Sequence, residues 1–152
     1  MALINTASLE NAEGTIKEAY DMFMKNLGVI PRPLEMMSAS PTIFDQQLQR
    51  IQYYTDHPTL SFALLSHIRY LVAHNLNYSF CMDFNKLMLK KQGLEDGDIH
   101  KMEADPTKSL LEEKESAMLA FVVKAVKAPS SVDADEINRL KEMGWTDKDL
   151  VD

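Results

Sequence analysis

The sequence has few cysteines, few basic residues and few glycines, and each shortage excludes a class of protein. Its 152 residues include one cysteine, Cys81, which excludes an intrachain disulfide and a metal site made of several cysteines. A free thiol is typical of the reducing cytosol. Acidic residues outnumber basic ones by 23 to 16, and the net charge is −7. This charge disfavours nucleic acid and a membrane surface as partners, because both require clustered lysine and arginine.

Long apolar segments and glycine-rich loops are also missing. No segment approaches the roughly 18 consecutive apolar residues of a membrane-spanning helix. The first residues, MALINTASLENAEG, have neither the basic nor the apolar region of a signal peptide, so we expect a cytoplasmic protein. The five glycines are scattered and form no phosphate-binding loop, and no cofactor is expected.

The apolar residues that are present have the spacing of helices. In residues 16–27 they recur every three or four positions, and no segment shows the strict alternation of a strand. The sequence therefore predicts an all-α protein of seven or eight helices in a single domain over residues 1–152. The ten methionines are expected to fill its core. The predicted helices cover residues 16–27, 33–38, 41–54, 59–74, 78–91 and 109–127 and part of 131–145, with short turns at 94–103.

Several predicted helix ends carry residues that favour capping. Gly28 is expected to end the first helix, and Asn77 and Ser109 are candidate N-caps. With Asn77 as the cap, Cys81 is the fourth residue of its helix. The residues TDKD at 146–149 predict a capping box that opens a last helix. The chain stops three residues later, so either that helix is vestigial or the chain ends early.

Three segments, taken in their order along the chain, resemble one known family. They are GVIPRPLEMMSASP (28–41), LSFALLSHIRYLVAHNLNYSFCMDFN (60–85) and KQGLEDGDI (91–99). The pattern resembles the carboxymuconolactone decarboxylase family and, within it, the AhpD-like (alkylhydroperoxidase) branch. The resemblance implies an all-helical AhpD-like bundle that assembles as a homotrimer or homohexamer.

The catalytic motif of the AhpD-like branch matches this chain at one position of four. The family motif is C-x-x-C-x-x-x-H, with a glutamate twelve residues before the first cysteine. In the family the second cysteine attacks a peroxide, the first resolves it as a disulfide, and the histidine and glutamate relay protons. Cys81 stands at the attacking position, whereas Tyr78, Asn85 and Ser66 replace the resolving cysteine, the histidine and the glutamate. The segment SFCMDFN is similar to a variant of the family that also has asparagine in place of the histidine.

The three replacements remove the usual chemistry of the motif. A tyrosine forms no disulfide, and an asparagine cannot carry a proton near neutral pH. His67 and His74 are seven residues apart on one predicted helix face and are candidate bases for Cys81. Two histidines without a third ligand make a poor metal site, so no metal is expected.

The reactivity of Cys81 stays open at this point. A helix N-terminus favours a thiolate there, whereas Asp83 and the flanking Phe80 and Phe84 disfavour it. The thiol is therefore either an inert packed side chain or an oxidisable, ligand-contacting group.

Three functions are compatible with this sequence, and whether the protein is an enzyme stays open. In the first, Cys81 alone reduces a hydroperoxide in an antioxidant role, and an external thiol reductant restores it. In the second, the protein is a catalytically degenerate scaffold or binding protein in which Tyr78, Phe80 and Phe84 line a pocket for a small apolar ligand. In the third, a decarboxylase or lactone-type enzyme uses His67 or His74 as acid–base, which nothing in the spacing specifically supports.

Overall fold

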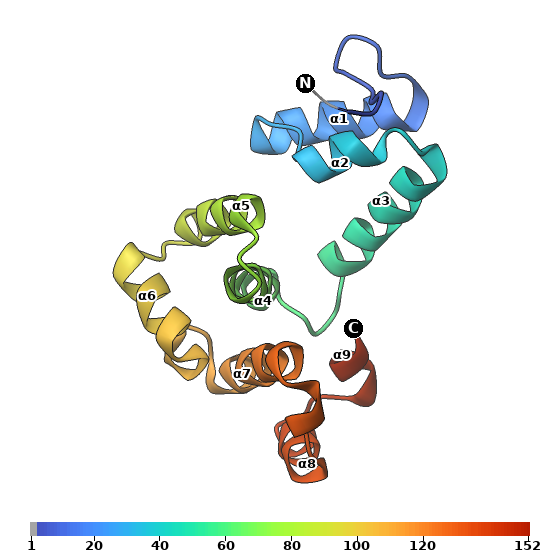
Figure 1. The fold of residues 1–152 in the computed structure, drawn as a ribbon. Coiled ribbons are helices and arrows are strands. Elements are labelled where there is room, and N and C mark those ends of the chain that lie inside the picture. The colour runs from blue at the N-terminus through green and yellow to red at the C-terminus, as the bar shows by residue number, and fades with distance from the viewer. Residues whose placement is uncertain (1–2) are drawn as a thin grey trace. The chain divides into compact units, whose positions relative to one another are not determined.

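A computed structural model describes residues 3–152, which form helices and connecting turns and no strand (Figure 1). The all-α prediction is therefore confirmed. The described residues contain nine α-helices, of which seven have at least seven residues. The chain divides into two compact units, of which unit 1 ends at His57 and unit 2 covers Pro58–Asp152. That both units belong to one domain stays a prediction.

Unit 1 contains three helices around a small apolar core. They are α1 (Gly14–Leu27), α2 (Arg32–Met37) and α3 (Pro41–Thr55). As predicted, α1 ends at Gly28, whose φ of 75° lies in the left-handed region that glycine adopts without strain.

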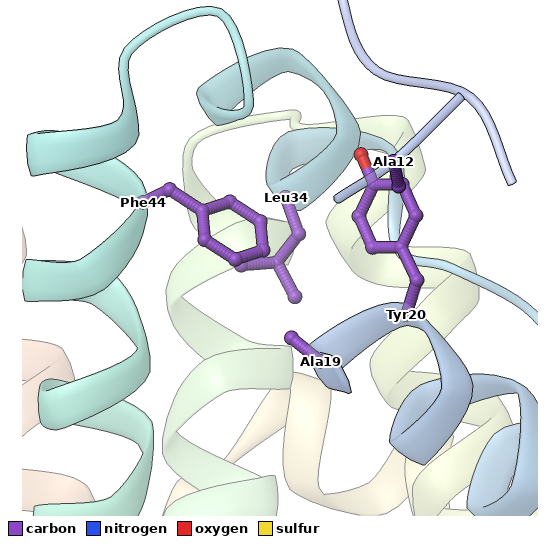
Figure 2. Close-up of a cluster of buried hydrophobic side chains, with 5 residues drawn as sticks. All are labelled: Ala12, Ala19, Tyr20, Leu34 and Phe44. Carbon is purple, nitrogen blue, oxygen red and sulfur yellow. The ribbon is translucent and has the colours of Figure 1, made fainter. Parts of the chain in front are cut away.

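The core of unit 1 is drawn in Figure 2, where α1, α2 and α3 each contribute side chains. The ring of Tyr20 packs edge-on against Phe44 with 6.0 Å between their centroids. The hydroxyl of Tyr20 donates to the main-chain oxygen of Ala7 at 3.2 Å, and the N–H of Ala7 donates to Ser38 Oγ at 2.8 Å. These two bonds hold the segment before α1 against the core. The buried residues of the core are Ala12, Ala19, Tyr20, Leu34 and Phe44.

Unit 2 is built around α4, which packs against both α5 and α7. Seven of the fourteen residues of α4 are buried, which explains its nearly continuous apolar sequence. The helices of unit 2 are α4 (Phe62–Asn75), α5 (Ser79–Lys91), α6 (Asp96–Ala104), α7 (Glu113–Lys127), α8 (Ala134–Glu142) and α9 (Asp147–Val151), with 3₁₀ turns η1 (Pro106–Lys108) and η2 (Pro129–Ser131).

Helix starts account for most differences from the sequence-based expectations. Ser61 caps α4, because its Oγ accepts from the N–H of Leu64 at 3.0 Å, so α4 begins later than residue 59. Asn77 is not the N-cap of α5: its φ of 56° places it in the left-handed link after α4, a conformation that asparagine tolerates. Ser109 is not the N-cap of α7, since Glu112 holds that place and the Ser109 hydroxyl donates to Ser116 Oγ at 3.1 Å.

Two short segments of unit 2 are more regular than the sequence alone indicates. Residues 96–104 form a helix rather than isolated turns, stabilised by reciprocal hydrogen bonds between Glu95 and Asp98. The capping box predicted at Thr146 and Asp149 is confirmed, and it opens α9.

Two further expectations concern the methionines and membrane-spanning segments. Met102 and Met118 lie in the core as expected, but Met22, Met24 and Met36 are exposed. No helix within residues 3–152 has both the length and the apolarity needed to cross a membrane.

Candidate functional site

Cys81 lies in the first turn of α5, where its side chain is half-buried. The helix begins at Ser79 after the N-cap Tyr78, so Cys81 is its third residue and stands nearer the helix end than expected. No side chain of residues 3–152 caps this end. The N–H of Met82 is the first to bond within the helix, to the Tyr78 oxygen at 2.9 Å. The preceding N–H groups therefore remain available to stabilise a negative charge beside the helix end.

The other three motif positions lie on α4, on α5 and at the N-cap of α5, and two of their side chains bond to the main chain. Tyr78 is 60% exposed. Asn85 is buried, and its Nδ2 donates to the main-chain oxygen of Cys81 at 2.8 Å. Ser66 is also buried and donates to the main-chain oxygen of Phe62 at 2.7 Å. Within residues 3–152, none of these three side chains hydrogen-bonds the Cys81 thiol.

His67 is buried on α4 with one nitrogen satisfied and one orphaned. Its side chain is 2% exposed. Nδ1 lies 2.8 Å from the main-chain oxygen of Ala63 and donates to it, because a carbonyl oxygen only accepts. Nε2 is therefore a bare lone pair, and it has no hydrogen-bond partner among the described residues.

Burial lowers the pKa of His67, and the Ala63 hydrogen bond and the charge of Glu115 oppose this only in part. At neutral pH the imidazole is consequently uncharged, and its Nε2 can accept a hydrogen bond. It makes no hydrogen bond to Cys81 in the described part of the chain.

His74 lies one turn beyond Tyr70 on the same helix, and their rings stack with 6.2 Å between centroids and 19° between planes. Its Nδ1 is buried and has no hydrogen-bond partner in residues 3–152. His67, Tyr70 and His74 thus form a polar stripe on α4, at the three- and four-residue spacing of one helix face.

Two acidic residues near this stripe could not be assigned from the sequence. Glu103 of α6 accepts a hydrogen bond of 2.5 Å from the Tyr70 hydroxyl, and Glu115 of α7 is close enough to act on the charge of His67. Burial, together with the Glu103 bond, raises the pKa of Tyr70 above its ordinary value. The spacing of α4 identifies the stripe, but its partners come from helices more than thirty residues away.

In the part of the chain that the structure describes, the surroundings of these residues offer little to bind a metal ion or a ligand. Within residues 3–152, no group of three or more histidine, cysteine, aspartate or glutamate side chains is arranged to hold a metal ion. The rings of Phe80 and Phe84 stack on each other with 6.3 Å between centroids, and Phe80 is 42% exposed. A groove of about 560 Å³ in unit 2 is lined by none of Tyr78, Phe80 and Phe84.

Comparison with known proteins finds a similar fold at low sequence identity. No protein-family model and no curated protein sequence matches the chain. A solved structure of an uncharacterized peroxidase-related protein from Silicibacter sp. TM1040 is similar, with a TM-score of 0.75 and 15% sequence identity. The match covers 89% of this chain and 71% of that chain. The chain has the fold of a peroxidase-related protein. At this identity the likeness concerns the fold, and activity is argued from the site.

Proposed function

We propose that this protein is an AhpD-like member of the carboxymuconolactone decarboxylase family that reduces hydroperoxides with a single cysteine, Cys81. The fold it shares with a peroxidase-related protein supports the family. The observation that carries the activity is the position of Cys81, half-exposed in the uncapped first turn of α5. This position leaves the sulfur accessible to a hydroperoxide, and a helix N-terminus stabilises a nearby negative charge by about 0.3–1 kcal/mol.

In the proposed first step, the Cys81 thiolate attacks one peroxide oxygen. An S–O bond forms, the O–O bond breaks, and the leaving alkoxide takes a proton from water and departs as an alcohol. The cysteine is oxidised by two electrons to a sulfenic acid, and the hydroperoxide is reduced. Cys81 is the one cysteine of the sequence, and Tyr78 stands where a resolving cysteine would be, so no second thiol of this chain can resolve the sulfenic acid.

In the proposed second step, an external thiol supplies the two electrons. Its sulfur attacks the sulfenic acid of Cys81, which forms a mixed disulfide and releases water. A second thiol, or the second group of a dithiol carrier, attacks this disulfide and restores Cys81. We further propose that the protein works in the cytoplasm as a homotrimer or homohexamer, as the family resemblance implies.

The test is to trap the sulfenic acid on the intact protein. Treatment with an alkyl hydroperoxide and a dimedone-type reagent, followed by mass spectrometry, should label Cys81 and no other residue. Peroxide consumption with an added dithiol should fall to the uncatalysed rate in Cys81→Ser. A Cys81→Ser protein that retained full turnover would overturn the proposal, and so would a wild-type protein that is never labelled.

A further inference from the structure

A groove in unit 2 has the features of a ligand site and is formed without α4 or α5. It is lined by residues of η1, α7 and α8 and of the segments next to them, and α7 packs directly against η1 and α8 (Figure 1). Its volume of about 560 Å³ lies within the range of pockets that hold small organic ligands. The lining residues are Thr107, Leu111, Glu113, Ser116, Ala117, Phe121, Glu136, Arg139, Leu140 and Met143.

Half of this lining is apolar. Phe121 and Leu140 are 9% and 3% exposed and belong to the packed interior of unit 2. The side chains of Leu111, Ala117 and Met143 are half-buried. A ligand with an apolar body would cover the remaining exposed surface of these three side chains, which is favourable because it removes apolar surface from water.

Most polar groups of the lining are already engaged. Glu136 accepts from Lys124 Nζ at 2.6 Å. The Ser116 hydroxyl donates to the main-chain oxygen of Thr107 at 3.3 Å and accepts from Ser109 at 3.1 Å. These groups contribute to the wall of the groove and have little capacity left to recognise a ligand.

Arg139 differs, because its guanidinium makes no hydrogen bond or ion pair with any residue between 3 and 152. A guanidinium presents paired N–H donors that match a carboxylate in a two-point contact. Glu113 also lines the groove, and Glu136 is neutralised by Lys124, so Glu113 is the carboxylate that would repel a second negative charge on a ligand. The free charge therefore complements one anionic group.

We propose that this groove binds a small monocarboxylate with an apolar body, whose carboxylate pairs with Arg139 and whose body lies on Leu111, Ala117 and Met143. The site is separate from the proposed chemistry of Cys81 and does not depend on it. Its selectivity comes from one free cation beside an apolar floor, with the Glu113 carboxylate disfavouring dianions.

The experiment uses sodium octanoate as the probe and the full chain carrying ¹³C-labelled methionine and alanine methyl groups. Titration should shift the Met143 and Ala117 methyl signals saturably. Octanoate should bind about 10-fold or more tightly than octylamine or the dianion suberate of equal chain length. Arg139→Gln should weaken octanoate about 10-fold, and Glu113→Gln should strengthen it. The matched control, Lys127→Gln, removes an exposed cation of α7 that does not line the groove and should leave binding unchanged.

Two results would overturn the proposal. Equal affinity for octanoate, octanol and octylamine, unchanged in Arg139→Gln, would show only non-selective apolar contact. Absence of any shift at Met143, with a mass by sedimentation that rises with protein concentration and falls in Ala117→Glu, would assign the groove to a second copy of this chain. Because every readout is binding or mass, a failure of Cys81 to react with peroxide has no bearing on the result.

Discussion

The side chain of Asn85 donates a hydrogen bond of 2.8 Å to the main-chain oxygen of Cys81, one turn earlier in α5. The family motif has a proton-carrying histidine at this position. Here the residue contacts the main chain of the cysteine rather than its sulfur, and it is 8% exposed. Asn85 therefore stabilises the first turn of the helix and makes no contact with the sulfur.

We predict that Asn85→Leu destabilises the fold without changing the reactivity of Cys81. The variant removes a buried hydrogen bond, which costs about 1 kcal/mol, and the leucine retains much of the volume. The free energy of unfolding from urea titration should fall by that amount, while the alkylation rate of Cys81 at neutral pH stays the same. A large change in the alkylation rate at unchanged stability would instead mean that the amide acts on the thiol.

A second prediction concerns the missing resolving thiol. Tyr78 is exposed at the N-cap of α5, three residues before Cys81, and this spacing places two cysteine sulfurs within reach of a disulfide. In Tyr78→Cys, peroxide should therefore produce an intrachain disulfide in place of the trapped sulfenic acid. The measurement is the mass loss of two hydrogens, reversed by a reductant. Tyr78→Ser is the control and should keep the wild-type labelling.

We predict that His67 contributes to the loss of folding stability as the pH falls. Because burial holds its folded pKa below the ordinary value of about 6.5, the unfolded chain takes up a proton first as the pH falls. The contribution of His67 is complete above pH ~6.5 and is lost progressively toward its folded pKa. Urea titrations between pH ~7.5 and ~5 should show a shallower loss in His67→Gln than in the wild type.

The control for His67 is His100→Gln, because His100 is exposed on α6. If the curve of His67→Gln departs from that of the wild type no more than the curve of His100→Gln does, the buried imidazole is not responsible for the pH dependence.

Tyr70 and Glu103 should be coupled in a double-mutant cycle. The Tyr70 hydroxyl donates to a carboxylate at 2.5 Å from a side chain that is 2% exposed, and hydrogen bonds to charged groups contribute about 1.5–3 kcal/mol. Tyr70→Phe should lower the free energy of unfolding by that amount. Glu103→Gln should cost less, and the double variant should cost less than the sum of the two. Strict additivity would show that the bond does not form in solution.

The sequence predicts where the helices of this protein lie better than it predicts which residues contact each other between helices. Apolar spacing identifies α4 and the face that carries His67, Tyr70 and His74, because the period of a helix is local information. The same spacing says nothing about Glu103 and Glu115, which reach that face through tertiary packing. The same holds for the candidate site. Cys81 could be identified from its residue type and from the family resemblance, whereas the hydrogen bond of Asn85 to the main chain could not be predicted.

Local conformation also limits prediction at the start of α5. Asparagine is a good N-cap, and Asn77 precedes the helix, so the sequence favours it for that role. The structure uses another property of asparagine, its tolerance of a positive φ, at 56° in the link after α4. Arg139 is a similar case, because a basic residue in the last turn of a helix is ordinarily a solvated charge that complements the dipole, and only the packing of α7 against α8 places it on a groove.

The last prediction concerns how the two ends of unit 2 are joined. Asp149 of α9 is 6% exposed and accepts hydrogen bonds at 2.8 Å and 2.7 Å from the N–H and hydroxyl of Thr146. It also accepts one from the Thr59 hydroxyl, ninety residues away at the other end of the unit. Asp149→Ala removes the capping box with Thr146 and the hydrogen bond from Thr59, so it should cost about 1–2 kcal/mol in urea unfolding of the full chain. Asp147→Ala, on the same helix but largely exposed and paired with the exposed Lys141, should change stability by less than about 0.5 kcal/mol. Equal effects of the two substitutions would mean that α9 is not held by Asp149, whereas the expected difference would show that this short helix stabilises the whole of unit 2.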